Sequence, residues 1–263
     1  MIFLDGPTVS ELTRRGVDTR GDAWIARSID LAPGILARIH AEYMEHGCTH
    51  HRANTFRTRL RNVGARWREL ASAAVDIARG ARPNVLLGSV GPIFDCYRPD
   101  LSPGEQSRAE HREIAQHLAP KVDGFVCEAF AAPHEAAVAV EECVRTGKPT
   151  WVALTAGPSA ELMTPAQMRD AAKRCIDAGA SAVLVNCVAA SRTLPYVDAI
   201  TGLGVPSGAY ANAAEWNGPE VRPDDYAAFA RTWADAGAEI LGACCGTGPD
   251  WIRTLGDRLR TPR

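Results

Sequence analysis

The amino-acid sequence predicts a single α/β domain spanning residues 1–263, folded as one (β/α)8 (TIM) barrel. Eight short, apolar, β-prone runs recur along the chain, and longer stretches of helical character separate them. No linker rich in proline and glycine divides these units. A chain of 263 residues with 46% hydrophobic composition can also bury the core of one large barrel. These three observations favour the barrel over a doubly wound sheet with a second domain.

Eight runs of β-prone residues mark the predicted strands. Runs such as GFVCEAF and PTWVALT, rich in β-branched and aromatic residues, are typical of buried strands. In chain order the runs cover residues 2–5, 48–54, 85–91, 124–130, 149–155, 182–187, 206–212 and 239–245. The last of them, EILGACC, ends in two adjacent cysteines.

Amphipathic segments separate the strands. Residues 35–47 present one apolar helical face, formed by Ile35, Ile39, Tyr43 and Met44. Gly47 suits the end of this helix, because glycine readily adopts the left-handed conformation found there. Residues 164–180 carry the same kind of signal, with Thr164 as the N-cap and Gly179 at the end. The chain therefore alternates strands with helices, as a (β/α)8 barrel requires.

The charge and composition of the chain exclude several classes of partner. The formal net charge is −2 and the basic residues are scattered, so no face of one sign would attract nucleic acid or anionic lipid. The N-terminal stretch has no leader-like pattern, and no apolar run reaches the roughly 20 residues of a membrane span. We therefore expect a cytoplasmic protein with small-molecule partners. Monomeric and homo-oligomeric states both stay open.

The chain contains eight cysteines. In a reducing compartment these are expected as free thiols, metal ligands or catalytic groups rather than as a disulfide framework. Cys244 and Cys245 are adjacent within the segment GACCGT. On this pair alone, metal ligation, a vicinal disulfide and two inert core thiols are all open interpretations.

The residues that close the predicted strands are candidate site residues, because the active site of such a barrel lies at the C-terminal ends of its strands. All of them are polar or carry a thiol: Asp5, Asn54, Ser89, Glu128, Thr155, Cys187, Asn212, Cys244 and Cys245. Three thiols should therefore converge on one mouth. Three thiolates bind Zn²⁺ tightly and leave the fourth position of a tetrahedral ion open to a substrate atom. A substrate thiol bound there would stay a nucleophilic thiolate at neutral pH.

Other potential ligands are expected to lie outside this centre. His50 and His51 follow each other in a predicted strand, so they face opposite sides and at most one points inward. Four cysteines are expected to be buried structural thiols: Cys48, Cys127, Cys143 and Cys175. Cys96, in the loop after the third strand, is expected to be structural as well, and it is the candidate among these five thiols to approach the mouth.

Six segments of the chain resemble the homocysteine S-methyltransferases, a family that includes the betaine-dependent enzymes and the N-terminal module of cobalamin-dependent methionine synthase. They are LDGPTVSELTRRG (4–16), ANTFRT (53–58), GSVGP (88–92), CEAF (127–130), VNC (185–187) and GACCGTGPDWI (242–252). The segments occur in the order of the family and extend over nearly the whole chain. VNC followed by GACCGT is the most specific signal, because it joins a rare tripeptide to a rarer pair of cysteines.

The resemblance implies a zinc-dependent barrel that methylates the sulfur of homocysteine and forms methionine. Cys187, Cys244 and Cys245 match the zinc ligands of the family, and Asp5 and Glu128 match the carboxylates that hold the amino group of homocysteine. Further substrate-binding candidates lie in the first turn and at strand ends: Gly6, Thr8, Asn54, Ser89 and Asn212. The methyl donor is expected to be small, and a sulfonium such as S-methylmethionine or S-adenosylmethionine is favoured.

Several positions depart from the pattern of the family. Pro7 has no backbone N–H, so a turn that binds the substrate carboxylate through amides lacks one donor, which Thr8 is expected to replace. Arg57 stands where the betaine-dependent enzymes carry a tyrosine near the metal, which argues against a betaine donor. Residues 93–105 differ from the corresponding loop of relatives that use sulfonium donors. Trp216 is a candidate to stack on a cationic donor.

Two alternatives to a zinc methyltransferase follow from these departures and from the vicinal cysteines. In the first, the barrel binds a thiol through zinc but has lost turnover or changed its specificity, as the altered turn at Pro7 would suggest. In the second, the protein is a redox protein that uses Cys244 and Cys245 as a switch.

Overall fold

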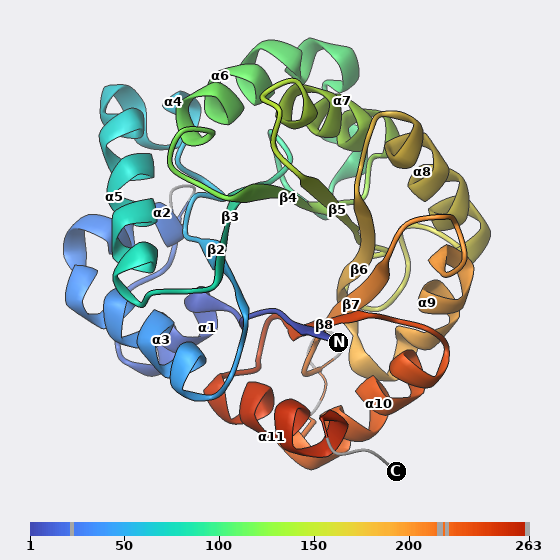
Figure 1. Cartoon of the computed structure of the whole chain (residues 1–263). Coiled ribbons are helices and arrows are strands. Elements are labelled where there is room, and N and C mark those ends of the chain that lie inside the picture. Colours follow the sequence, from blue (N-terminus) through green and yellow to red (C-terminus); the bar gives the residue numbers. More distant parts are fainter. Residues whose placement is uncertain (22–23, 215–217, 219–220, 261–263) are drawn as a thin grey trace.

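The computed structural model describes residues 1–21, 24–214, 218 and 221–260, so Trp216 lies outside the described residues. Strands surround a central axis and helices form an outer ring (Figure 1). The strands are β1 (Ile2–Phe3), β2 (His50–Ala53), β3 (Val85–Val90), β4 (Gly124–Phe130), β5 (Thr150–Leu154), β6 (Ala182–Ala189), β7 (Ser207–Asn212) and β8 (Ile240–Ala243).

The eight strands form one closed sheet. They pair in the order β1-β8-β7-β6-β5-β4-β3-β2, and every pair is parallel. At the two ends of this order, a bridge between Leu4 and His50 joins the segments that contain β1 and β2. The backbone N–H of Asp5 also donates to the carbonyl oxygen of His50 at 3.0 Å. This closure confirms the predicted (β/α)8 barrel.

The α-helices that surround the barrel follow the strands in sequence. They are α1 (Thr8–Arg14), α2 (Trp24–Leu31), α3 (Pro33–Glu45), α4 (Leu60–Val63), α5 (Trp67–Gly80), α6 (Arg108–Leu118), α7 (Pro133–Val144), α8 (Pro165–Asp177), α9 (Leu194–Ile200), α10 (Pro223–Asp235) and α11 (Pro249–Leu259). Short 3₁₀ helices cover residues 64–66, 99–101, 104–107 and 190–192. Within the described part of the chain, no helix is long and apolar enough to cross a bilayer.

All predicted strands are present, with differences of a few residues at their ends. β8 ends at Ala243, so Cys244 and Cys245 lie in the loop that follows and not in the strand itself. β6 continues to Ala189 instead of ending at Cys187. Both differences arise at the barrel mouth, where the strands give way to the loops that carry the candidate site.

The two helices predicted from capping signals are confirmed. At α8 the side chain of Thr164 accepts the N–H of Gln167 at 3.3 Å, and the Gln167 side chain accepts the N–H of Thr164 at 2.8 Å. This reciprocal pair satisfies backbone donors that have no partner within the helix. Gly47 and Gly179 follow α3 and α8 with φ of 86° and 101°, the conformation in which helices commonly end.

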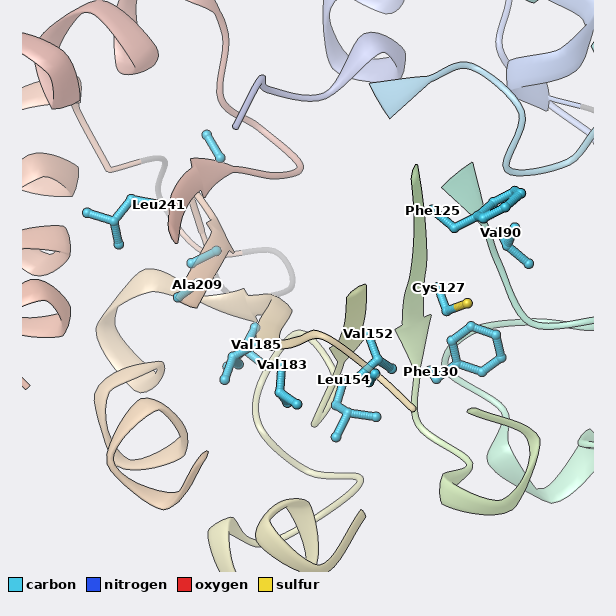
Figure 2. Close-up of a cluster of buried hydrophobic side chains, with 14 of the residues drawn as sticks. Val90, Phe125, Cys127, Phe130, Val152, Leu154, Val183, Val185, Ala209 and Leu241 are labelled. Atoms are coloured by element: carbon cyan, nitrogen blue, oxygen red, sulfur yellow. The ribbon is translucent and has the colours of Figure 1, made fainter. Parts of the chain in front are cut away.

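Two apolar layers hold the barrel together. Outward-facing side chains of the strands pack against the helices, and ten of them are labelled in Figure 2: Val90, Phe125, Cys127, Phe130, Val152, Leu154, Val183, Val185, Ala209 and Leu241. The inner layer includes Leu87, Val126, Leu184 and Ile240. Because these residues precede the strand ends, the barrel is filled with apolar side chains beneath the polar residues at its mouth.

Two β-bulges interrupt the regular alternation near the ends of β4 and β6. The pairing register shifts after Cys127 in β4 and after Asn186 in β6. Ala129 and Cys187 lie in these bulges with φ of 62° and 56°, in the left-handed region that residues with a Cβ rarely adopt. Such conformations cost free energy and are concentrated at functional sites, so the two bulges point to the mouth as the site.

Candidate active site

A cavity of about 460 Å³ opens at the C-terminal ends of the strands. Its wall includes the predicted substrate-binding and metal-binding residues Asp5, Gly6, Thr8, Asn54, Ser89, Glu128, Cys187, Asn212, Cys244 and Cys245. Thr155, the remaining strand-end candidate, is fully buried outside this wall, and its hydroxyl accepts the N–H of Gly157 at 3.1 Å. Arg52, Phe56, Cys96 and Tyr97 line the same cavity. Its volume is in the range that binds small molecules.

Three cysteine sulfurs gather in the wall of this cavity. The Sγ atoms of Cys187 and Cys244 are 3.3 Å apart, and those of Cys244 and Cys245 are 3.9 Å apart. Tetrahedral zinc with Zn–S bonds of about 2.3 Å separates its sulfur ligands by about 3.8 Å, and these two separations lie near that value. Cys187 and Cys244 are buried, whereas Cys245 is exposed. Hydrogen bonds from the two buried thiols lower the pKa of Cys245, which favours a thiolate in the cluster.

The bulge in β6 turns the Cys187 side chain toward the other two cysteines. Val183 and Val185 face the outer layer (Figure 2). Leu184, between them, belongs to the inner layer. Strict alternation would send Cys187 outward together with Val185. The register shift and the positive φ of Cys187 reverse that direction, and its side chain lines the cavity beside Cys244.

Two asparagines hold Cys187 in this orientation. Nδ2 of Asn186 donates to the Cys187 sulfur at 3.4 Å, and Oδ1 of Asn186 accepts the N–H of Ala129 at 3.3 Å, which ties the two bulges together. Nδ2 of Asn212 donates to the carbonyl oxygen of Cys187 at 3.0 Å. Asn212, a substrate-binding candidate from the sequence, therefore holds loop backbone through this contact. Its Oδ1 is buried and has no hydrogen-bond partner among the described residues.

The loop after β8 is fixed by hydrogen bonds to its own backbone and to α1. The hydroxyl of Thr247 donates to the carbonyl oxygen of Cys244 at 2.6 Å. The N–H of Gly246 donates to Oγ of Ser10 in α1 at 3.0 Å. These bonds place Cys244 and Cys245 against the end of β6 before any ligand binds.

Arg52, from β2, is a site residue that the sequence analysis missed. Its Nε donates to Oδ1 of Asp5 at 2.7 Å, and its backbone N–H donates to Oδ2 of the same carboxylate at 3.0 Å. Its Nη1 donates to Oε2 of Glu128 at 3.0 Å. Both oxygens of Asp5 are therefore bonded to Arg52. An arginine inside a predicted strand, two positions before Asn54 and hence on the same face, was the signal available in the sequence.

Glu128 is held by three other side chains of the barrel interior. Besides Arg52, the hydroxyl of Tyr210 donates to its Oε2 at 2.9 Å. The hydroxyl of Ser89 donates to its Oε1, so Ser89 positions a carboxylate. Glu128 keeps 8% of its surface exposed, against 1% for Asp5, and so it is the carboxylate that a ligand can reach.

The turn after β1 is packed tightly against α3. A Cβ atom on Gly6 would lie 2.8 Å from ring carbons of Tyr43, so glycine is required there. The Tyr43 hydroxyl donates to the carbonyl oxygen of Pro7 at 3.1 Å. The Thr8 hydroxyl donates to Oδ1 of Asn54 at 3.0 Å, so it is already engaged within the protein and the backbone amide of Thr8 is its remaining donor.

The loop after β3 covers part of the cavity. Cys96 and Tyr97 lie in its wall, so Cys96 does reach the mouth. Burial raises the pKa of Tyr97, with the nearby cysteines acting in the same direction, so its phenol is neutral. Arg57 anchors this loop, because its Nη1 donates to the carbonyl oxygens of Pro92 and Phe94 at 3.3 and 2.8 Å. Tyr97 carried no motif that would have identified it in the sequence.

Glu135 of α7 anchors the same loop and contacts a buried histidine. Its Oε1 accepts the N–H of Ile93 at 2.7 Å, and its Oε2 accepts the hydroxyl of Ser102 at 2.5 Å. Nε2 of His111, a fully buried residue of α6, lies 3.4 Å from Oε1 of Glu135. Burial lowers the pKa of His111 to about 4, although Glu135 acts in the opposite direction. The positive charge of Arg59 lowers the pKa of His111 further.

The free energy of unfolding is expected to fall as the pH drops from about 6.5 to about 4 because of His111. In the unfolded chain His111 binds a proton near its ordinary pKa of 6.5, whereas in the folded protein it stays neutral until the pH nears 4. The unfolded state therefore binds more protons in this interval, at a cost of up to about 3 kcal/mol. Urea denaturation at pH 7, 6 and 5 measures the effect. His111→Gln should weaken the pH dependence, and an unchanged slope would contradict this assignment.

His50 and His51 face opposite sides, as expected from their adjacent positions. The ring of His50 stacks on Trp151, with ring centroids 5.3 Å apart. His51 is fully buried, and its Nε2 lies 2.6 Å from Sγ of Cys48. The two rings therefore do not share a ligand.

Asp5, His40 and His51 form a second group with possible metal ligands behind the cavity. Their ligand atoms lie within 4.8 Å of one another, and all three side chains are buried. Nδ1 of His51 is 3.9 Å from Oδ2 of Asp5. However, the guanidinium of Arg52 is bonded to the same carboxylate, and its positive charge opposes a metal cation there. The three cysteines are the stronger candidate for a metal centre.

The fold and the mouth together define a (β/α)8 enzyme with a cluster of thiols and carboxylates around a cavity of small-molecule size. The chain matches the family profile described as Homocysteine S-methyltransferase over residues 2–259. It belongs to the homocysteine S-methyltransferase family, and it is a methyltransferase enzyme, as the sequence resemblance implied.

Several relatives match the chain over nearly its full length. Homocysteine S-methyltransferase YbgG of Bacillus subtilis (strain 168) is 22% identical, in a match that covers 97% of this chain and 93% of the relative. The homocysteine S-methyltransferase of Escherichia coli (strain K12) is 25% identical and covers 97% and 94%. A selenocysteine Se-methyltransferase of Brassica oleracea var. italica is 23% identical and covers 99% and 89%.

A solved structure shares the fold. The crystal structure of the homocysteine methyltransferase MmuM from Escherichia coli, in its metallated form, has a TM-score of 0.84 and 22% sequence identity. The match covers 98% of this chain and 96% of that chain. This likeness supports the barrel fold.

Proposed function

We propose that this protein is a zinc-dependent methyltransferase that moves a methyl group from a small sulfonium donor to the thiol of homocysteine, forming methionine. S-methylmethionine and S-adenosylmethionine are the favoured donors. Cys187, Cys244 and Cys245 would hold the zinc. The observation that carries the proposal is the spacing of these sulfurs, 3.3 and 3.9 Å, in the wall of the cavity. Three thiolates select zinc over hard cations such as Mg²⁺. The family match supports homocysteine as the acceptor.

Bound zinc would hold the acceptor thiol as a thiolate at neutral pH, where a free thiol with a pKa of about 8.5 is mostly protonated. The residues of the chain provide the surroundings. Phe56 and Tyr97 line the cavity together with the cysteines and give it aromatic surface. Glu128 is the more accessible of the two carboxylates in the cavity wall. The proton of the acceptor thiol leaves to solvent on binding.

The transfer step forms a bond between the acceptor sulfur and the methyl carbon of the donor. At the same time the bond between that carbon and the sulfonium sulfur breaks, and its electron pair stays on the donor sulfur as a neutral thioether. No covalent bond to the protein is required. The contribution of the barrel is therefore to hold the two reactants in line, which can supply much of the rate enhancement.

Removal of the metal tests this function. The purified protein is expected to carry about one zinc per chain, and chelation should abolish methionine formation from homocysteine and S-methylmethionine. The circular dichroism spectrum should stay that of a folded barrel, because the apolar layers do not depend on the metal. Activity that survives complete chelation would contradict the proposal. Unfolding on chelation would indicate a structural ion instead.

The donor is assigned in the same assay. S-methylmethionine, S-adenosylmethionine, betaine and methylated folate are supplied in turn to the zinc-loaded protein with homocysteine, and methionine is measured. A sulfonium is expected to support turnover. Methionine formation from betaine alone would overturn the choice of donor while leaving the acceptor in place.

A further inference from the structure

The guanidinium group of Arg52 lies between the two carboxylates that the sequence resemblance assigns to the amino group of the acceptor. Its Nε is 2.7 Å from Oδ1 of Asp5, and its Nη1 is 3.0 Å from Oε2 of Glu128. An ammonium group held by both carboxylates would need this same space. In this chain, the positive group between Asp5 and Glu128 is therefore the side chain of Arg52 and not the ammonium group of a ligand.

Arg52 is held too firmly to move aside for a ligand. Besides its bonds to the two carboxylates, its Nη2 donates to the carbonyl oxygens of Asp5 and Ala243 at 3.0 and 3.3 Å. The guanidinium carbon also lies 4.6 Å from the centre of the Tyr210 ring, a cation–π contact. A planar group fixed by a fork of hydrogen bonds and a stacked ring has little freedom to rotate.

Arg52 changes the net charge of the site. Asp5 and Glu128 without a bound cation would carry two negative charges at the base of the cavity, which favours a positively charged ligand group. With Arg52 in place the three side chains carry one net negative charge, and Asp5 is only 1% exposed. An ammonium group that approaches Glu128 also meets the fixed guanidinium at close range, and this repulsion offsets part of its attraction to the carboxylate.

We propose that Arg52 determines acceptor specificity by taking the place of the amino group of the acceptor. The acceptor class of this enzyme then extends to ω-mercaptocarboxylates, thiols that end in a carboxylate and lack an α-amino group. One N–H of Nη1 has no acceptor among the contacts of the described residues, and Arg52 lines the cavity, so this N–H can donate to the carboxylate of the acceptor. This inference rests on the proposed function, because it concerns the acceptor of the same reaction.

The test compares homocysteine with 4-mercaptobutyrate, which has the same chain and carboxylate but hydrogen in place of the amino group. For the wild-type, zinc-loaded protein with S-methylmethionine, kcat/KM for the two thiols is expected to agree within about tenfold. In Arg52→Ala an ammonium group can enter between the carboxylates, so the preference for homocysteine should rise to about a hundredfold or more. Arg52→Lys keeps the charge and should retain a ratio close to that of the wild type.

Binding measurements decide the role of Arg52 independently of turnover. The two thiols are titrated calorimetrically into the zinc-loaded wild type, so the result does not depend on the folding of any variant. Similar affinities support the proposal. Binding of homocysteine alone, or of neither thiol, overturns it. If both thiols bind but no donor gives a methylated product, the proposed function fails while the role of Arg52 stands.

Discussion

The Cys187→Ala variant is expected to lose its zinc and to transfer methyl groups at least about a thousandfold more slowly than the wild type, while the barrel stays folded. Cys187 supplies the sulfur closest to Cys244, at 3.3 Å, and it is the only one of the three that comes from β6. Without it, two adjacent cysteines on one loop remain, and two thiolates cannot hold the ion in an open tetrahedral site. Zinc content by atomic absorption and methionine formation measure the two losses.

Cys175→Ala is the matched control. Cys175 is also fully buried, but it lies on α8 and packs in the outer layer between the barrel and the helices. Its loss should leave the zinc content and the turnover of the zinc-loaded enzyme unchanged, at the cost of a small cavity. If Cys187→Ala retained stoichiometric zinc and normal turnover, the three-cysteine centre would be wrong, and the group around Asp5, His40 and His51 would become the place to look for a metal.

The Asp5→Asn variant is expected to lower the free energy of unfolding of the metal-free protein by about 3 kcal/mol. Asp5 is 1% exposed, and its two oxygens accept the Nε and the backbone N–H of Arg52 at 2.7 and 3.0 Å. An amide of the same shape removes the negative charge and turns one of these acceptors into a donor. The buried guanidinium then keeps only Glu128 as a counter-charge. In a chain of this size, the thermal midpoint should fall by about 6–12 °C.

An exposed aspartate–arginine pair is the control for this variant. Asp18 and Arg20 form a bidentate pair on the surface, with about half or more of each side chain exposed. Asp18→Asn should leave the thermal midpoint unchanged, because water replaces the lost partner. An equally small effect of Asp5→Asn would show that the buried network around Arg52 does not stabilise the barrel.

Much of the fold could be read from local patterns. Strands such as β4 and β5 are short apolar runs, and α8 is framed by the capping pair of Thr164 and Gln167 and by Gly179. These signals act over a few residues, so they survive in the linear sequence. The ends of β6 and β8 were less well predicted, because a strand ends where its neighbour stops offering hydrogen bonds.

The candidate site could be read only in part. The position of the cysteines and the carboxylates at strand ends predicted that they share one mouth, because every parallel strand of a barrel ends on the same side. It could not place Arg52, whose neighbours Asp5 and Glu128 are 47 and 76 positions away in the chain. It could not find Tyr97 either, since that residue enters the cavity only through the path of a loop.

By itself, the sequence determined that strands and helices alternate, that polar residues and thiols end the strands, and which family the chain resembles. Only the tertiary structure decided where those side chains point. Alternation along β6 would turn Cys187 away from the mouth, and the bulge with its left-handed residue, tied by Asn186 to the bulge of β4, turns it back. The placement of the Arg52 guanidinium between Asp5 and Glu128 likewise depends on the tertiary structure. Arg52 lies on β2, Glu128 on β4 and Asp5 in the turn after β1, and these segments meet only when the barrel closes.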